Sequence, residues 1–491
     1  MKVSPRFSIV IPTRNRADTL RFALATCLNQ KFDDYEVVVC DNSDDQSSKD
    51  VVEAANSPFV RYLAPGQPLA MSANWERGVR EARGEYVTVL GDDDGLMPYA
   101  LRELNAIVQR SNPKAIQWSR GIYTWPSIGI PGEQDLLRIP LARSLIEVDG
   151  RAQIAKVMRF ETGPDSLPMI YCSVIHRDLI ELHRKRTGRV FLNVYPDVYS
   201  AFGFGYLAGS YLSTTVPMNI AGLSHASNGV ATLMNEDINA VATDFEKLNA
   251  QFGYVAHPRV PRRMILGPVH VVDCFLHAKD ALFPEDNSLD VDRKAVTVRY
   301  LGAISDTDPG VRKAVRKTIR ESLADDRELL EWFDDHAPHL PPAAPFSFRP
   351  NRLGYDGYML SVDASAVNVT QIAEAVDFAA SLLGFDAREI EYDVPVLHEV
   401  GVLCSKASQR VLELERVVVG REEEALAATL KIDALQQACA ALEQKLGEAH
   451  GAIGQISLQL SEAQRTGSLR YVPRRLLRKM LMSLRRLPGT K

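Results

Sequence analysis

The first hundred residues alternate between strand-like and helix-like segments, and this alternation constrains the fold more than any other feature. Apolar runs typical of buried strands occur at FSIVIP (7–12), YEVVVC (35–40) and EYVTVL (85–90), with a weaker run at FVRYLA (59–64). The amphipathic segments ADTLRFALATCLNQ and ANWERGVREARG lie between them. Strands and helices that alternate at this spacing predict a doubly wound, mostly parallel α/β sheet.

Polar clusters follow three of the predicted strands. They read PTRNR after the first strand, CDNSDD after the second and GDDDGLMP after the fourth. Ligands of such sheets bind beyond the carboxyl ends of the strands, and parallel strands bring those ends to one edge. We therefore expect the three clusters to form one ligand site.

Three consecutive carboxylates, Asp92, Asp93 and Asp94, directly follow the strand YVTVL. Their mutual repulsion must be offset, and a divalent cation does this well. Mg²⁺ and Mn²⁺ prefer oxygen ligands, typically one or two carboxylates together with the phosphate oxygens of a substrate. A polar turn is the alternative, because Asp-Gly is also turn chemistry.

Residues after the first two strands suit a nucleotide. The hydroxyl of Thr13 and the guanidinium groups of Arg14 and Arg16 fit a diphosphate, although a solvated helix entry capped by Asp18 explains the same residues. Asp41 could accept hydrogen bonds from a nucleobase or ribose, and its alternative is an Asx turn over DNSDD.

Together with the helix that carries Asn74 and Arg77, these segments resemble, in order and spacing, the N-terminal half of the inverting family 2 glycosyltransferases with the GT-A fold, of the bacterial type. The resemblance is close over residues 5–105 and looser up to residue 235. It implies a nucleotide-diphospho-sugar donor, Mg²⁺ or Mn²⁺, and inversion at the anomeric carbon of the transferred sugar.

The resemblance also implies the roles of individual residues. The residues that bind the nucleotide-sugar would be Pro12, Thr13, Arg14, Arg16, Asp41, Asn74 and Asp92. The metal ligands would be Asp93, Asp94 and His225, with Asp93 favoured. A structural or solvated loop histidine is the alternative for His225, which lies in AGLSHASNG. The family usually has an Asp where Gly91 stands, so the Asp-x-Asp spacing survives here only as Asp92 and Asp94.

Inverting transfer needs a general base that takes the proton of the acceptor hydroxyl. Asp197 in NVYPDVYSAFGF resembles the family's catalytic Asp in spacing and setting. Burial among aromatic side chains would raise its pKa, since desolvation disfavours a carboxylate. A helix N-cap is the alternative for Asp197, and Asp165 in TGPDSLP is the second candidate for the base.

Changes in composition divide the chain of 491 residues further. We expect a GT-A domain over 1–235 (nucleotide-sugar half 1–105, acceptor half 106–235), a helical region over 236–337, a Pro-rich linker over 338–350, a small appended segment over 351–400, a coiled coil over 401–465 and a basic amphipathic tail over 466–491. The apolar heptads of the coiled coil predict a homo-oligomer, and a helix that packs on its own domain is the alternative.

Charge is distributed unevenly along the chain. The net charge is −5, but residues 466–491 hold eight Lys or Arg and no Asp or Glu, so the remaining residues carry −13. An acidic body argues against nucleic-acid binding. The basic tail predicts an anionic membrane surface as partner, and a solubilising tail or a helix that docks on an acidic partner are its alternatives.

Six cysteines without CxxC spacing, and an N-terminus without a signal-peptide core, predict a reduced, cytoplasmic protein. The basic tail adds a peripheral position at the inner face of the cell membrane. We expect a glycosyltransferase of bacterial surface glycan synthesis that acts on a lipid-linked glycan or a protein acceptor. A GT-A scaffold with reduced activity is one alternative. A nucleotidyltransferase is another, and IPTRNR in place of a Gly-rich, Lys-terminated loop argues against it.

Overall fold

The computed structural model describes residues 4–64, 66–130, 132–225, 227, 247–261, 267–304, 309–337, 353–385, 390 and 392. The predicted linker (338–350), coiled coil (401–465) and basic tail (466–491) lie outside the described residues and stay predictions.

The four predicted N-terminal strands form and run parallel. They are β1 (Phe7–Thr13), β2 (Tyr35–Asp41), β3 (Val60–Leu63) and β4 (Tyr86–Val89), in the order β3-β2-β1-β4. The connections contain α1 (Ala17–Leu28), α2 (Ser47–Ala55) and α3 (Met71–Glu81). In this register Thr13 lies beside Asp41, so the polar clusters after β1 and β2 meet at one edge, as predicted.

The complete first sheet is mixed, where the sequence predicts a mostly parallel one. Its eight strands follow the order β3-β2-β1-β4-β10-β6-β11-β9. Strand β10 (Ser173–His176) lies between β4 and β6 (Ala115–Trp118) and is antiparallel to both. Strand β11 (Ser210–Thr214) is parallel to β6, and the edge strand β9 (Leu145–Asp149) is antiparallel to β11. Helix α4 (Ala100–Ser111) precedes β6.

A second, six-stranded sheet includes residues from near the end of the described chain. Its order is β13 (Gly354–Tyr355), β14 (Met359–Asp363), β8 (Leu136–Pro140), β7 (Gly121–Thr124), β12 (Asn219–Leu223) and β5 (Gly95–Leu96). The predicted appended segment thus supplies β13 and β14, and it continues into α14 (Ile372–Leu383). Helix α14 packs on α1, β5 and β12, so this segment is part of the same core as the N-terminal sheet.

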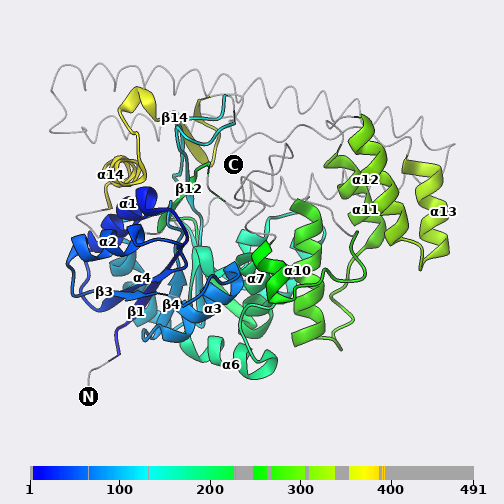
Figure 1. The fold of residues 1–491 in the computed structure, drawn as a ribbon, viewed down its shortest axis with the longest axis horizontal. Helices are drawn as coiled ribbons and strands as arrows, with labels where there is room; N and C mark the ends of the chain where they lie inside the picture. The colour runs from blue at the N-terminus through cyan, green and yellow to red at the C-terminus, as the bar shows by residue number, and fades with distance from the viewer. Residues whose placement is uncertain are drawn as a thin grey trace, which may run out of the picture. The chain divides into compact units, whose positions relative to one another are not determined.

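Further helices pack around the two sheets or come after them in the chain (Figure 1). They are α5 (Gly150–Met158), α6 (Arg177–Thr187), α7 (Pro196–Ala208), α10 (Gly267–Leu282), α11 (Arg293–Gly302), α12 (Pro309–Ser322) and α13 (Arg327–His336), with the 3₁₀ turns η1 (Pro164–Ser166) and η2 (Ile170–Cys172). The described part of 236–337 is helical from α10 onward. Among the helices described, none is long and apolar enough to cross a membrane.

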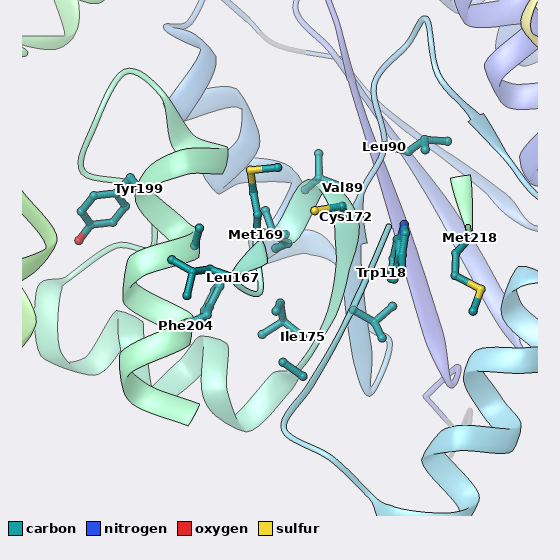
Figure 2. Packing of buried hydrophobic residues seen from close by; sticks show 14 of the residues in the cluster. Val89, Leu90, Trp118, Leu167, Met169, Cys172, Ile175, Tyr199, Phe204 and Met218 are labelled. Atoms are coloured by element: carbon teal, nitrogen blue, oxygen red, sulfur yellow. The ribbon is translucent and has the colours of Figure 1, made fainter. Parts of the chain in front are cut away.

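Helix α7 is apolar on all sides and is buried among other elements. Pro196 occupies its first turn, where a missing N–H costs nothing, and no charged residue follows Asp197 within the helix. It packs against α10, α5 and α6. Figure 2 shows its Phe204 beside Leu167, with Met169 and Ile175 nearby. An apolar surface of this kind fixes the position of the helix firmly.

His183 of α6 lies fully buried against α7 and should make stability depend on pH. Burial lowers the pKa of His183 to about 4. The imidazole ring lies edge-on against the rings of Tyr199 and Phe204 on α7. The neutral form is therefore the folded form. Above pH about 6.5 the histidine is neutral in both the folded and the unfolded protein, and this site costs no stability. As the pH falls towards about 4, only the unfolded protein takes up the proton, so the free energy of unfolding falls by up to about 3 kcal/mol.

Urea unfolding of the wild type and of His183→Leu, each at pH about 7 and about 4.5, measures this contribution. The wild type should lose more stability on acidification than the variant, because the leucine does not titrate. Equal losses in the two proteins would contradict the assignment, whatever the stability of the variant at neutral pH.

Candidate active site

The loop that carries the three carboxylates follows β4 and is buried. Asp92 is 2% exposed, and both of its oxygens accept hydrogen bonds from the cluster after β1. Thr13 Oγ1 donates to Oδ2 at 2.7 Å, and Arg16 Nη1 donates to Oδ1 at 3.0 Å. The clusters after the first and fourth strands therefore meet at the carboxyl edge of the sheet.

Asp93 connects the acidic loop to the turn after β12. Its Oδ2 accepts hydrogen bonds from Ser224 Oγ at 2.7 Å and from Ser227 Oγ at 2.6 Å. The same turn contains His225, whose side chain is exposed. The fold thus brings the loop of Asp93 and the turn of His225 together across about 130 residues of sequence. The second oxygen of Asp93, Oδ1, takes no part in these two bonds.

Asp94 points into the protein. Its Oδ1 accepts a hydrogen bond from the Gly222 N–H at 2.7 Å, and its Oδ2 accepts one from the Gly91 N–H at 3.1 Å. Burial, followed by the charge of Asp93, raises the pKa of Asp94 to about 7. A side chain at Gly222 would collide with the backbone oxygen of Asp93, so only glycine allows β12 to approach the loop this closely.

Tyr171 of η2 occupies the space in which a side chain at position 91 would lie. A Cβ atom on Gly91 would lie 2.5 Å from the Tyr171 hydroxyl and 2.9 Å from Asp94 Oδ2. The Tyr171 ring stacks on Trp75 of α3 at 6.0 Å between centroids, and burial raises its pKa well above the ordinary value. The departure from the family pattern at Gly91 thus has a steric cause.

The residues expected around the nucleobase are engaged within the protein. Asp41 is 2% exposed and accepts hydrogen bonds from the Ser43 N–H at 2.8 Å and from Tyr62 Oη at 2.6 Å. The first of these bonds is the Asx turn that was the alternative for this residue. Pro12 lies half-buried in β1, beside Cys40 of β2.

Arg14 and Asn74 brace the end of β2. Arg14 Nη1 donates to the Asn42 carbonyl at 2.5 Å. On α3, the buried Asn74 donates from Nδ2 to the Cys40 carbonyl at 2.8 Å and accepts from Arg77 Nη2 at 3.0 Å. The nitrogen end of the Asn74 amide therefore holds the strand, and its oxygen end is bound by Arg77 of the same helix.

Asp197, the candidate base, lies in the first turn of α7 and is half-buried. The N-cap of this helix is Tyr195, so Asp197 does not take the N-cap position that was its alternative. Burial raises the pKa of Asp197, while the Val198 N–H and the charge of Arg120 oppose this rise. The other candidate, Asp165 in η1, is exposed.

Arg120 is a site residue that the sequence analysis missed. It lies in the turn between β6 and β7, 3.7 Å from Asp165 and 5.6 Å from the Tyr171 ring centroid. Its positive charge acts on Asp94 and on Asp197, so it links the two halves of the site. A single arginine in WSRGIY belongs to no motif, and only the fold reveals its neighbours.

The side chains of the acidic loop could hold a divalent cation only if a bound substrate supplied further oxygen ligands. In the described ranges, no three His, Cys, Asp or Glu side chains converge in a way that could hold a metal ion. Both oxygens of Asp92 and both oxygens of Asp94 accept protein hydrogen bonds, whereas Asp93 keeps Oδ1 apart from its two serine bonds. One carboxylate completed by substrate phosphates is an ordinary Mg²⁺ arrangement.

Comparison with known proteins matches this region to one family. Residues 8–149 match the family model of Glycosyl transferase family 2. The chain contains a family 2 glycosyltransferase domain. The match contains the strands β1 to β4 and the acidic loop, while Asp197 and the turn of His225 follow it in the sequence.

Curated relatives of the glycosyltransferase domain come from bacteria. A GalNAc(5)-diNAcBac-PP-undecaprenol beta-1,3-glucosyltransferase of Campylobacter jejuni is 32% identical over 111 residues, which are 22% of this chain and 35% of that protein. A chondroitin synthase of Escherichia coli is 38% identical over 91 residues, 18% of this chain and 13% of that protein. The chain thus spans about a third or less of the length of these relatives.

Among solved structures, S. aureus TarS 1–349 in complex with UDP-GlcNAc covers 72% of this chain and 98% of its own. It is 14% identical, and its TM-score of 0.39 is below the level at which a common fold can be inferred.

The clash at position 91 leads to a prediction for stability. Gly91→Ala should lower the free energy of unfolding by about 1–3 kcal/mol, because the added methyl group meets the Tyr171 hydroxyl and the Asp94 carboxylate. In a Tyr171→Phe background the same change should cost less, because the hydroxyl is gone. Urea unfolding of the four proteins gives the coupling energy, and an equal cost in both backgrounds would exclude this steric explanation.

Proposed function

We propose that the protein is an inverting glycosyltransferase that transfers a sugar from a nucleotide-diphospho-sugar to a hydroxyl acceptor in bacterial surface glycan synthesis. One observation carries this proposal. The buried acidic loop lies within the family 2 match, and hydrogen bonds join it to the polar cluster at the end of β1 and to the turn after β12. An inactive scaffold would not need to bury three adjacent carboxylates, each with its own donors.

The donor would bind at this edge of the sheet. Thr13, Arg16 and Asp92 would face its diphosphate and ribose, and Pro12, Arg14, Asp41 and Asn74 would surround its nucleotide. Asp93, through Oδ1, and His225 would hold Mg²⁺ or Mn²⁺ together with the donor phosphates. When bound, the cation would neutralise the negative charge that develops on the departing nucleoside diphosphate. Asp94 is less favoured as a ligand, because backbone N–H groups occupy both of its oxygens.

Asp197 would act as the general base. It would accept the proton of the acceptor hydroxyl while the oxygen of that hydroxyl bonds to the anomeric carbon and the bond to the diphosphate breaks. Its raised pKa makes it a stronger base than an exposed carboxylate. Arg120 limits this rise and so keeps the carboxylate ionised.

A lipid-linked glycan is the acceptor that we favour, since the Campylobacter jejuni relative is named for a polyprenyl-linked saccharide. A protein acceptor is the alternative. Association with the inner face of the membrane through 466–491, and a homo-oligomer through the coiled coil over 401–465, remain proposals that rest on the sequence alone.

The cation should be needed for tight binding of the donor. Calorimetry with UDP-, GDP- and dTDP-linked sugars should find at least one that binds with Mn²⁺ and much more weakly with EDTA, because the phosphates complete the site. Asp93→Asn should lose this dependence, whereas the exposed Asp165→Asn should keep it. Equal affinity in Mn²⁺ and EDTA, together with an unaffected Asp93→Asn, would overturn the assignment.

The base assignment has a separate test. Asp197→Asn keeps the shape of the side chain but cannot take a proton, so donor affinity should persist while transfer falls by about 10²–10⁴-fold. Turnover is measured as release of the nucleoside diphosphate in the presence of acceptor. Near-normal turnover in a folded Asp197→Asn protein would move the base elsewhere, and loss of turnover in Asp165→Asn would identify its place.

A further inference from the structure

We propose that Asp273 of α10 is a positioning residue for transfer: through Asn193 it holds the start of α7 so that Asp197 faces the acceptor. This inference rests on the proposed function and deepens it. Asp273 lies well beyond the family match and belongs to a region whose role the sequence left open.

Asp273 collects hydrogen bonds from separate segments of the chain. It is 2% exposed. Its Oδ2 accepts from Asn193 Nδ2 at 2.6 Å and from Tyr254 Oη at 2.5 Å, and its Oδ1 accepts from the His257 N–H at 2.7 Å. His277 of the same helix lies 3.5 Å from Oδ1. A carboxylate can accept all of these bonds at once, whereas an amide would present a donor to one of them.

The donors keep Asp273 ionised. Burial alone would raise its pKa, but the nearby His277 side chain and the hydrogen bonds from Tyr254, His257 and Asn193 together hold the pKa below the usual range. Charge-assisted hydrogen bonds are about twice as strong as neutral ones, so the link to Asn193 is a firm one.

Asn193 passes this constraint on to α7. It is fully buried, and the bond from Nδ2 to Asp273 turns its Oδ1 towards the Tyr195 N–H, which donates to it at 3.1 Å. Tyr195 is the N-cap of α7, and Asp197 follows two residues later. The intervening Pro196 has a fixed φ angle, so little freedom remains between the anchored amide and the candidate base.

Helix α3 holds the same segment from another direction. The Ser72 hydroxyl donates to the Asn193 carbonyl, and Glu76 Oε2 accepts hydrogen bonds from the N–H groups of Val190 at 2.7 Å and Phe191 at 3.3 Å. Residues 190–195 are therefore held between two buried carboxylates, Glu76 and Asp273.

Helices α10 and α7 also pack directly against each other (Figure 1). His270 of α10 stacks on Tyr195 at 4.1 Å between ring centroids and lies 3.0 Å from its hydroxyl. Because α10 and α7 share contacts besides the Asp273–Asn193 hydrogen bond, removing that bond should shift Asp197 without unfolding the helix pair.

The test compares three single variants of the full chain. Asn193→Ala removes the link to α7, and Asp273→Asn weakens it, because an amide has a single acceptor oxygen and presents N–H groups to the remaining donors. Tyr254→Phe removes a hydrogen bond to the same oxygen of Asp273 but leaves Asn193 in place, so it is the matched control. The first two should lower kcat for transfer by about 10²-fold while the KM and Kd of the donor stay unchanged, because the base is displaced and the donor edge is not. The control should keep kcat.

A fourth comparison separates positioning from a general loss of structure. If Asp273 acts through Asp197, then Asn193→Ala should add nothing to the loss already caused by Asp197→Asn. An additive loss, an increase in donor KM, or an equal loss in Tyr254→Phe would overturn the inference.

Failure of the inference can be told from failure of the proposed function. Normal kcat in Asn193→Ala and Asp273→Asn, with a large loss in Asp197→Asn, refutes the positioning role and leaves the base in place. Normal kcat in Asp197→Asn refutes the base itself. Should Asp273→Asn not fold, the milder Asn193→Ala carries the test alone.

Discussion

The structure of the site depends on the burial of three adjacent carboxylates. A buried carboxylate without partners is costly, so each of the three needs its own donors. The fold supplies them from three directions: Thr13 at the end of β1 with Arg16 just beyond it, the serines after β12, and backbone N–H groups for Asp94. The positions of β1, β4 and β12, and of the turn that contains His225, place these donors within hydrogen-bond distance of the carboxylates.

Much of the fold follows from local patterns in the sequence. Strands β1 to β4 and their helices were predictable because apolar runs, amphipathic periodicity and turn residues agree over a short stretch. The convergence of Thr13 and Asp92 was equally predictable, since parallel strands end at one edge. The antiparallel β10 and the pairing of β14 with β8 were not, because long-range strand pairing leaves no local mark on the sequence.

The site shows the same division. The position of the acidic loop was predictable because it directly follows a buried strand, and Asp197 stays a prediction that rests on its resemblance to the family's catalytic Asp. Arg120, Tyr171 and Asp273 could not, because each owes its importance to neighbours that are distant in sequence. For Asn74 the sequence predicted the position on a helix but not the contact. Its amide donates a hydrogen bond to the Cys40 carbonyl of β2.

Strand β14 and helix α14 have a consequence for how the chain is made. Helix α14 packs on β5, the strand directly after Asp94, and β14 covers the edge of β8. A ribosome must therefore deliver residues up to about 383 before the acidic loop has its final surroundings. Until then the nascent chain exposes an unpaired strand edge, a surface that attracts chaperones and other unfinished chains. Fragments cut at the end of the family match would retain that exposed edge permanently.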